Sequence, residues 1–214
     1  NMKDNVFFVS GIDTNVGKSY ATGYLAKTWN EQGVRTITQK FIQTGNVGMS
    51  EDIELHRKIM GTGLLPEDES GLTMPEIFTY PCSPHLAAEI DHRPIDFDKI
   101  EKATRQLSET YDAVLLEGAG GLMVPLTRDL LTIDYVAQKN YPLIFVTSGK
   151  LGSINHTLLS LEAVTRRGIR LHTVAYNLFP EEDDDIIRRD TEAYIRDLLA
   201  KEYPETHFVI VPKL

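Results

Sequence analysis

Residues 11–19 combine a glycine-rich turn with a lysine and a serine, groups that can bind phosphate at the start of a helix. The segment reads GIDTNVGKS; the apolar run VFFVS precedes it, and a stretch with helical character, YATGYLAKTWNEQG, follows. A phosphate-binding loop normally has four residues between its two glycines, whereas five separate Gly11 from Gly17. The segment is therefore either a phosphate loop of altered length or a tight turn with a surface lysine.

In the first interpretation, the backbone N–H groups of residues 14–18 point at phosphate oxygens, because the helix dipole favours an anion there. We expect Lys18 to reach the β- and γ-phosphates of a nucleotide as a point charge, and Ser19 to offer its hydroxyl to Mg²⁺. The expected contacts with ATP in this segment are Asn15, Val16, Gly17, Lys18, Ser19 and Tyr20.

A carboxylate stands where another buried strand is expected to end. The segment AVLLEGAGG is apolar up to Glu117 and then continues in glycines. Ligands of open parallel sheets gather at the carboxyl ends of the strands, so Glu117 can hold Mg²⁺ opposite Ser19. The backbone of Gly118, Ala119 and Gly120 is expected to approach the phosphates, since glycine permits close contact. The alternative is a strand that ends in a flexible turn with a hydrogen-bonded glutamate.

Two more charged residues belong to the same edge of the sheet. In TITQKFIQTG, Lys40 lies near the carboxyl end of a predicted strand, where its charge can stabilise an anionic transition state. Asp52 begins the next helical segment and can complete the Mg²⁺ shell. Acidic residues are also common in first helical turns without any metal, so a metal role for Asp52 depends on the other ligands.

These residues require a sheet that brings several strand ends together. Short apolar and β-branched runs occur at 6–10, 34–38, 113–117, 143–148, 171–177 and 207–211. Helical patterns separate them at 18–32, 51–60, 97–110, 132–139, 154–167 and 182–201. Nearly continuous apolar strands that alternate with helices predict an α/β fold with a mostly parallel β-sheet flanked by helices on both faces. Gly33 and Gly168 fit the C-terminal ends of two helices.

The length of the chain suits one domain, which we expect to span residues 1–214. Residues 1–4 are expected to be disordered or a remnant of cloning, because an Asn precedes Met2. Residues 61–95 are rich in Gly and Pro and predict an excursion over the surface rather than a linker. The acidic run EEDDD at 181–185 is expected to begin a helix rather than to bind a metal.

Composition argues against several classes of function. The formal net charge of −9 offers nucleic acid and anionic membranes no broad attraction, and no apolar run approaches the roughly 20 residues that cross a bilayer. Cys82 is the only cysteine, so one chain can form neither a disulfide nor a cysteine-based metal site. No secretory signal is visible before the first predicted strand, and we expect a cytoplasmic protein.

Ser83 and His85 invite a comparison with nucleophilic catalysis. On an extended segment, side chains two residues apart point the same way but lie about 7 Å apart. We therefore expect no catalytic Ser–His pair and assign Pro84 and His85 to the shape of a pocket or an interface. The six histidines show no spacing typical of metal ligands.

Seven segments, in their order and spacing, resemble the dethiobiotin synthetase family, whose phosphate loop has the same interval between its glycines. They are GIDTNVGKS, QKFIQTG, SEDIEL, CSPHLAAEIDHRPI, LLEGAGGLMVPL, GKLGSINHTLLSLEAV and VAYN, and they run nearly the full length of the chain. The resemblance implies a P-loop NTPase-like fold and a homodimer. Family members usually have a proline after the lysine of QKFIQTG, so we expect Phe41 to reshape the wall beside Lys40.

The reaction that this resemblance implies is the ATP-dependent closure of a ureido ring in biotin synthesis. One amine of 7,8-diaminopelargonate takes up CO₂ as a carbamate. The carbamate oxygen attacks the γ-phosphate of ATP, and the second amine closes the ring with release of phosphate. Two anions meet in the phosphoryl transfer, so cations must offset their repulsion. Lys18, Lys40 and Mg²⁺ can supply that charge.

The resemblance also implies the roles of individual residues. Lys40 and Lys18 are the expected catalytic residues. The expected Mg²⁺ ligands are Ser19, Asp52 and Glu117. Substrate contacts are expected at Thr44 and, for the carboxylate of the substrate at a two-fold interface, at Leu151, Gly152, Asn155 and Tyr194. Adenine contacts are expected at Asn177, Pro212, Lys213 and Leu214.

Two other functions of the same class compete. A cobyrinate-type amidating ligase typically carries a glutaminase domain with a cysteine nucleophile, for which this chain has neither the length nor a suitable cysteine. A partitioning or division-site ATPase has a signature lysine five residues before the loop lysine, and Asp13 stands at that position. Such a switch protein would also need a basic or amphipathic contact surface, which the sequence does not show.

Overall fold

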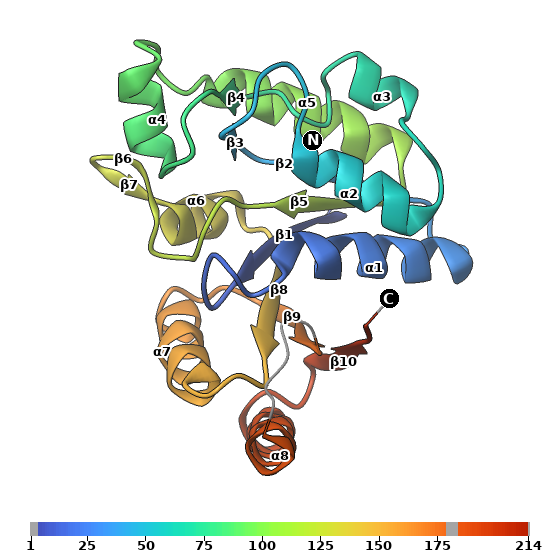
Figure 1. Cartoon of the computed structure of the whole chain (residues 1–214), viewed down its shortest axis with the longest axis vertical. Coiled ribbons are helices and arrows are strands. Elements are labelled where there is room, and N and C mark those ends of the chain that lie inside the picture. Colours follow the sequence, from blue (N-terminus) through green and yellow to red (C-terminus); the bar gives the residue numbers. More distant parts are fainter. Residues whose placement is uncertain (1–3, 179–183, 214) are drawn as a thin grey trace.

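Six parallel strands form the centre of the protein (Figure 1). The structure is a computed structural model and describes residues 4–178 and 184–213. Along the sheet the order is β10-β9-β8-β1-β5-β2, and each strand is parallel to its neighbours. The strands are β1 (Val6–Gly11), β2 (Thr36–Lys40), β5 (Ala113–Glu117), β8 (Leu143–Ser148), β9 (Leu171–Asn177) and β10 (His207–Val211). The predicted parallel sheet is confirmed.

The apolar runs form these strands at or within one residue of their predicted bounds, with β2 as the exception. The prediction placed this strand at 34–38, two residues too early. The chain has just left α1 through a left-handed turn at Gly33, and Val34 remains exposed, so pairing begins only at Thr36. The shift matters for function, because Lys40 becomes the last residue of the strand.

The direction of each crossover decides which face a helix covers. The helices are α1 (Lys18–Glu31), α2 (Glu51–Met60), α3 (Pro66–Glu69), α4 (Pro84–Ile90), α5 (Phe97–Thr110), α6 (Thr132–Lys139), α7 (Ser153–Arg166) and α8 (Asp185–Glu202). Crossovers between parallel strands are right-handed. The step from β1 to β2 runs in one direction along the sheet, whereas the later steps run in the opposite direction.

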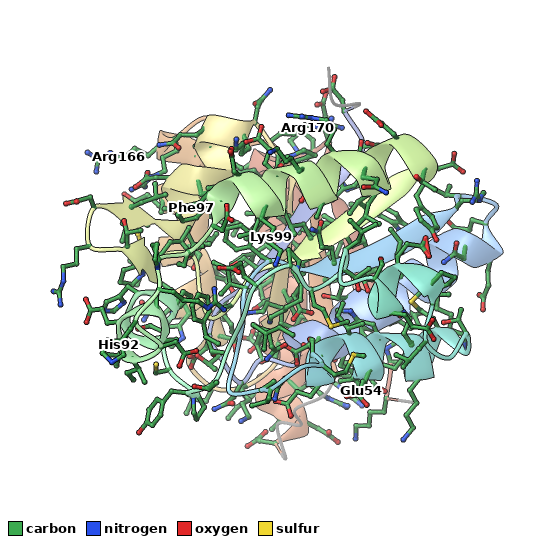
Figure 2. The ribbon with its side chains drawn as sticks, turned by 90° about the horizontal axis from the view of Figure 1, so that it is seen from above. Glu54, His92, Phe97, Lys99, Arg166 and Arg170 are labelled. Carbon is green, nitrogen blue, oxygen red and sulfur yellow. The ribbon has the colours of Figure 1, made fainter. Side chains whose placement is uncertain are left out.

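Because of this reversal, α1 packs on one face with α2 beside it, while α5, α6, α7 and α8 cover the other face. Figure 2 shows α2 and α5, which carry Glu54 and Phe97, on opposite sides of the molecule. The connections after the neighbouring strands β1 and β8 lead in opposite directions, so the loop after β1 lies at the switch point of the sheet, where ligands bind in open α/β folds.

A hydrophobic core on each face holds the layers together. Val9 and Leu115 pack with Leu25 of α1 in one core. Phe8 and Leu116 belong to the other core, which includes apolar residues of α5, α6, α7 and α8. Neighbouring residues of a strand point to opposite faces, so burial on both sides requires the nearly continuous apolar sequence that predicted these strands.

Residues 61–95 are more structured than the predicted excursion. They contain α3, α4 and β4 (Ile77–Phe78), which pairs in parallel with β3 (Gln43–Thr44). Asp68 and Glu76 of this segment are buried. A second small pair, β6 (Pro125–Thr127) and β7 (Leu130–Leu131), forms an antiparallel hairpin that was not predicted. Elements this short leave no periodic pattern in the sequence.

The ends of two helices follow the glycine signals of the sequence. Gly33 after α1 and Gly168 after α7 have φ angles of 88° and 67°. In each case the glycine N–H and the following N–H donate to carbonyls of the last helical turn, which is the Schellman arrangement. Both predicted helix stops are therefore confirmed.

Helix α8 begins at an acidic cap. The side chain of Asp184 accepts hydrogen bonds from the N–H groups of Ile186 and Ile187, which agrees with the prediction that the acidic run begins a helix. Residues 181–183 of that run lie outside the described residues, as do residues 1–3 of the predicted N-terminal remnant.

The prediction for Ser83 and His85 was wrong in its geometry. The Ser83 Oγ atom lies 3.0 Å from His85 Nδ1. The prediction assumed an extended segment, but Ser83 is the N-cap residue of α4, and the turn of the helix brings the two side chains together. Among the described carboxylates, none hydrogen-bonds to the His85 ring, so the pair lacks the third member of a catalytic triad.

None of the helices within residues 4–178 and 184–213 has the length and hydropathy of a membrane-spanning segment.

The ring of His172, which packs against the rings of Phe7 and Trp29, predicts acid sensitivity. Burial, and then the charge of His207, lowers the pKa of His172 from 6.5 to about 4. Because the folded protein resists protonation of this ring, the free energy of unfolding falls as the pH drops from 6.5 towards 4. The ring is partly exposed, so we expect only about 1 kcal/mol at pH 5. In urea titrations at pH 7 and pH 5, His172→Phe should lose less stability than wild type, whereas the exposed control His156→Gln should not differ from it.

Candidate active site

The register of the sheet places two opposite charges side by side. Lys40 is the partner of Glu117 in the ladder of β2 and β5, and Glu117 is also level with Val9 of β1. Both charged residues end their strands, and both point to the face covered by α1 and α2, as their contacts with Ser19 and Asp52 show. The carboxyl ends of three neighbouring strands therefore converge on one carboxylate.

The loop after β1 leads into α1 through a glycine that needs its conformational freedom. Gly17 is the N-cap residue of α1 and has a φ of 78°, in the left-handed region. No side chain caps this helix, and its first internal hydrogen bond joins the N–H of Ala21 to the carbonyl of Gly17. The N-terminus of α1 therefore presents backbone donors to the space above the sheet, as a phosphate cradle requires.

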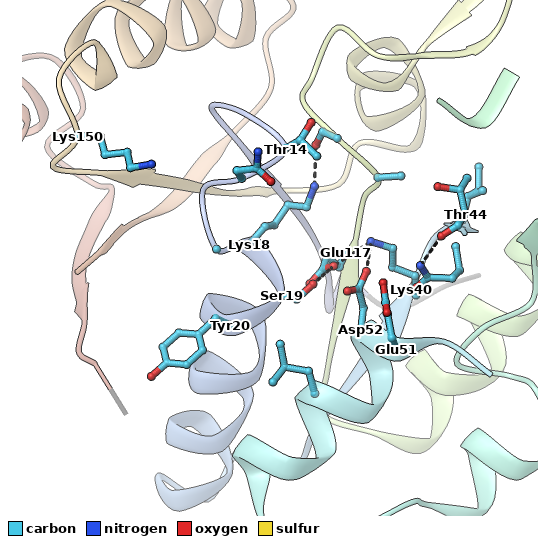
Figure 3. Close-up of a pocket in the computed structure, with 17 residues that line it drawn as sticks. Thr14, Lys18, Ser19, Tyr20, Lys40, Thr44, Glu51, Asp52, Glu117 and Lys150 are labelled. Carbon is cyan, nitrogen blue, oxygen red and sulfur yellow. Dashed lines mark hydrogen bonds and ion pairs between the residues drawn. The ribbon is translucent and has the colours of Figure 1, made fainter. Parts of the chain in front are cut away.

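The Glu117 carboxylate organises the cationic and hydroxyl groups around it. Its Oε2 atom accepts a hydrogen bond from Ser19 Oγ at 2.8 Å and lies 3.0 Å from Lys40 Nζ. The same ammonium lies 2.7 Å from Asp52 Oδ2, so Lys40 bridges the two carboxylates (Figure 3). The side chain of Glu117 is fully buried, whereas Asp52 is 23% exposed at the mouth of the site.

Burial and charge act against each other on these groups. Burial alone would raise the pKa of Glu117, but Lys40 and then His56 lower that pKa well below its ordinary value. Burial would likewise lower the pKa of Lys40, but Glu117 and then Asp52 raise it above the ordinary value. The pair is therefore an ammonium and a carboxylate throughout the neutral range.

The surroundings of Lys18 lower its pKa, in contrast to those of Lys40. The Lys18 ammonium donates to the carbonyl oxygen of Gly120 at 2.7 Å. Burial, and then repulsion from Lys40, lowers the pKa of Lys18 to about 8. The carboxylates of Glu117 and Asp52 offset this lowering only in part. An anion placed between the two lysines would therefore stabilise the charged form of Lys18.

A cavity of about 680 Å³ opens beside these residues (Figure 3). The predicted site residues that line it are Asn15, Gly17, Lys18, Ser19, Tyr20, Lys40, Thr44, Asp52, Glu117, Ala119 and Gly120. In Figure 3 the ring of Tyr20 points away from the group formed by Ser19, Glu117 and Lys40. Thr14, whose N–H was predicted to face phosphate, also lines the cavity. Lining residues that the sequence reasoning did not name are Ile42, Gln43, Glu51, Leu55 and Lys150.

Several predicted residues support this cavity without lining it. Val16 is buried against the core on the α1 face. Gly118 has no room for a side chain, since a Cβ atom there would meet the Phe8 ring at 2.8 Å. The Asn177 Nδ2 atom donates to the carbonyls of Val16 and Gly17, at 3.2 and 3.0 Å, and so ties the end of β9 to the phosphate loop.

Other predicted residues lie apart from the cavity. Leu151, Gly152 and Asn155 are exposed at the N-terminal end of α7, and Tyr194 is exposed on α8. Pro212 and Lys213 follow β10 and do not line the cavity. Leu214 lies outside the described residues. The structure therefore assembles the phosphate end of the predicted site within one chain and leaves the predicted carboxylate-binding residues on its surface.

The residue that sequence reasoning missed is His56. Its ring is fully buried on α2, and its Nε2 atom lies 2.9 Å from Glu117 Oε1. No spacing marks this histidine as functional, because its partner is far away in the sequence. The available signal was the helical pattern of EDIELHRKIM, which places His56 on the same face of the helix as Asp52 and Ile53.

Behind His56 lies a fully buried ion pair between α2 and α3. Arg57 donates from Nε and Nη2 to the two carboxylate oxygens of Asp68, both at 2.8 Å. Asp68 also accepts from the N–H of Leu65 and from the hydroxyl of Thr73. Every oxygen of this buried carboxylate is therefore satisfied, which such a pair requires for stability.

The strand order, the loop at the switch point and the lysine, serine and carboxylate set define a nucleotide-binding protein of the P-loop NTPase class. The AAA domain family matches residues 5–214. A solved ParA family ATPase from Chlorobium tepidum shares the fold, with a TM-score of 0.55 and 12% identity over 99% of this chain and 86% of that chain. At that identity the likeness concerns the fold alone.

Sequence comparison narrows this class to one family. The ATP-dependent dethiobiotin synthetase BioD 2 of Pasteurella multocida is 52% identical over 206 residues, which are 96% of each chain. The enzyme of the same name from Haemophilus influenzae is 57% identical over 184 residues, covering 86% of this chain and 96% of that relative. The chain belongs to the dethiobiotin synthetase family.

Removing the charge of Asp68 should destabilise the fold. In Asp68→Asn the buried Arg57 guanidinium loses its counter-charge, and we expect the free energy of unfolding to fall by about 3 kcal/mol. Urea unfolding followed by circular dichroism measures this change. The matched control is Glu69→Gln, an exposed acid on the same short helix, which should stay within about 0.5 kcal/mol of wild type. Equal stabilities of the two variants would contradict the structural role of the ion pair.

Proposed function

We propose that this protein is an ATP-dependent dethiobiotin synthetase acting on 7,8-diaminopelargonate, CO₂ and ATP in biotin synthesis. The observation that carries the assignment is the bridge that Lys40 makes between Glu117 and Asp52, directly beside the phosphate loop. It stands in a chain whose relatives of that name are 52% and 57% identical. Neither the amidating ligase nor the switch ATPase is favoured by these relatives.

The proposed reaction has three steps. One amine of the substrate attacks CO₂ and loses a proton, which gives a carbamate. A carbamate oxygen then forms a bond to the γ-phosphorus of ATP as the bond to the β-phosphate oxygen breaks, which gives ADP and a mixed anhydride. The second amine attacks the carbonyl carbon of the anhydride, phosphate leaves, and the ureido ring is closed.

Within this scheme the chain's own residues position and neutralise charge, which is most of what phosphoryl transfer requires. The backbone donors at the N-terminus of α1 hold the phosphates. Lys18 approaches them from one side, and Lys40 is placed to meet the attacking carbamate. Because Asp52 and Glu117 raise the pKa of Lys40, it acts as a fixed cation and not as a proton donor.

The oxygen donors of the site fit Mg²⁺. Ser19 and Glu117 are within hydrogen-bond distance of each other, and Lys40 links them to Asp52, so one hydroxyl and two carboxylates converge. Hard oxygen ligands of this kind suit Mg²⁺. We propose these three residues as its ligands; when bound, the ion would neutralise charge on the phosphates. The Lys40 ammonium now lies between the two carboxylates, so it would share them with the metal.

We propose that Asn177, with Pro212, Lys213 and Leu214, contacts the adenine. Support comes from the bonds that join Asn177 to the phosphate loop, which put this amide at the same edge of the sheet as the cavity. The proposed adenine contact of Leu214 rests on the family resemblance alone.

Substrate recognition is proposed to involve two copies of the chain. Thr44 lines the cavity and is placed to contact the diamine or its carbamate. Leu151, Gly152, Asn155 and Tyr194 lie on the surface, where they could receive the substrate carboxylate from a neighbouring subunit only in a homodimer. The 79% exposure of Leu151 supports such an interface. We propose one domain per chain and a cytoplasmic location, with no nucleic acid or membrane as partner.

The direct test supplies purified protein with 7,8-diaminopelargonate, bicarbonate and Mg-ATP. We expect dethiobiotin, ADP and phosphate in equal amounts, measured by mass spectrometry and a phosphate assay. Omission of the diamine should abolish phosphate release. Hydrolysis of ATP at the same rate without the diamine would contradict the assignment.

Lys40→Ala tests the role of the bridging lysine. Nucleotide affinity should stay nearly unchanged, because the backbone of the loop and Lys18 still hold the phosphates. Turnover should fall by about 100-fold or more, since a cation is lost where negative charge develops. Calorimetry measures the first quantity and single-turnover assays the second. The exposed Lys102→Ala serves as control and should match wild type; unchanged turnover in Lys40→Ala would remove this residue from the chemistry.

A further inference from the structure

A chain of buried hydrogen bonds runs behind the carboxylate of Glu117, away from the cavity. His56 Nε2 lies 2.9 Å from Glu117 Oε1, and His56 Nδ1 lies 2.7 Å from the hydroxyl of Thr38. Arg57 Nη1 donates to that same hydroxyl at 2.8 Å. All four side chains are buried, so water does not supply alternative partners.

The proton on the Glu117 side of the His56 ring follows from the chemistry of Glu117. An ionised carboxylate only accepts, so His56 Nε2 carries a proton and donates it to Glu117 Oε1. The Thr38 hydroxyl accepts from Arg57, because a guanidinium only donates, and the same hydroxyl contacts His56 Nδ1. Thr38 and Arg57 thereby hold the ring from behind while Nε2 faces Glu117.

This arrangement gives the two oxygens of Glu117 different partners. Oε1 accepts from His56 on the inner side, whereas Oε2 accepts from Ser19 and Lys40 on the cavity side. Because His56 holds Oε1, the carboxylate of Glu117 cannot rotate freely about the last torsion of its side chain. We propose that His56 is a positioning residue that fixes Glu117 so that Oε2 alone faces the nucleotide and its metal. The inference rests on the proposed function, in which Glu117 is a Mg²⁺ ligand.

Arg57, at the far end of this series of hydrogen bonds, is held in place by further contacts. Besides its bond to the Thr38 hydroxyl, Arg57 donates to the Thr38 backbone carbonyl at 3.2 Å and to both oxygens of Asp68. Asp68 belongs to α3 and is held there by Leu65 and Thr73. The orientation of Glu117 is thus set by a rigid scaffold of β2, α2 and α3, as a precise metal ligand needs.

Two amide substitutions separate positioning from packing. The amide nitrogen of Gln reaches the place of the imidazole Nε2, whereas that of Asn reaches only the place of Nδ1. His56→Gln should therefore keep the bond to Glu117, and His56→Asn should lose it. The control for α2 packing is Ile53→Val, which changes a buried apolar residue of the same helix.

The first readout is the affinity of Mn²⁺, measured by electron paramagnetic resonance with a non-hydrolysable ATP analogue bound. We expect His56→Asn to weaken Mn²⁺ binding by about 10-fold or more, with His56→Gln within about threefold of wild type and Ile53→Val unchanged. Binding of the analogue in EDTA should be the same in all four proteins. Wild-type Mn²⁺ affinity in His56→Asn, or an equal loss in His56→Gln and His56→Asn, would overturn the inference.

The second readout needs no variant and no metal. Nitrogen-15 spectra of the wild-type protein should show a proton on His56 Nε2; a ring without a proton on Nε2 would overturn the inference even if Mn²⁺ binds. Failure of the proposed function is seen separately, as a wild-type protein that makes no dethiobiotin. A wild-type protein that makes dethiobiotin while His56→Asn keeps full Mn²⁺ affinity would leave the function intact and reject the role of His56.

Discussion

The rest of the structure depends on the burial of one ionised carboxylate. An isolated charge inside a protein is too costly to keep, so Glu117 must be surrounded by donors. Ser19 comes from the helix after β1, Lys40 from the end of β2, and His56 from α2. Each donor fixes a different element, and the carboxylate in turn fixes them relative to one another. The site and the fold on this face of the sheet are therefore held by the same contacts.

Two lysines share the cavity but differ in electrostatic setting. Lys40 has two carboxylate oxygens within 3.0 Å, and its charge is neutralised before any ligand arrives. The Lys18 ammonium donates to the carbonyl oxygen of Gly120 and is repelled by the Lys40 ammonium. In the proposed reaction, an incoming polyphosphate would gain most from Lys18, whereas Lys40 would stabilise the negative charge that develops as the carbamate attacks. This difference between Lys18 and Lys40 follows from the groups that contact each ammonium, not from their positions in the sequence.

The sequence predicted the sheet well because burial on both faces demands continuous apolar strands, as in AVLLE and LIFVTS. It also predicted that the loop after β1, Lys40, Asp52 and Glu117 lie together, since the carboxyl ends of parallel strands meet at one edge; their catalytic and metal-binding roles stay predictions. The short elements in 61–95 and the Ser83–His85 contact were not predicted, because a four-residue helix or a helix cap leaves no periodic pattern of apolar residues in the sequence. His56 was not predicted for a different reason: its proposed role depends on contacts with Thr38 and Glu117, which are distant in sequence.

The series Thr38, His56, Arg57 and Asp68 has a genetic consequence. Each member is buried and satisfies its neighbour, so a single substitution strands a polar group inside the cluster. Apolar residues at all four positions would remove these internal losses and leave Glu117 Oε1, the N–H of Leu65 and the hydroxyl of Thr73 without these partners. Mutational paths through this cluster are therefore strongly epistatic.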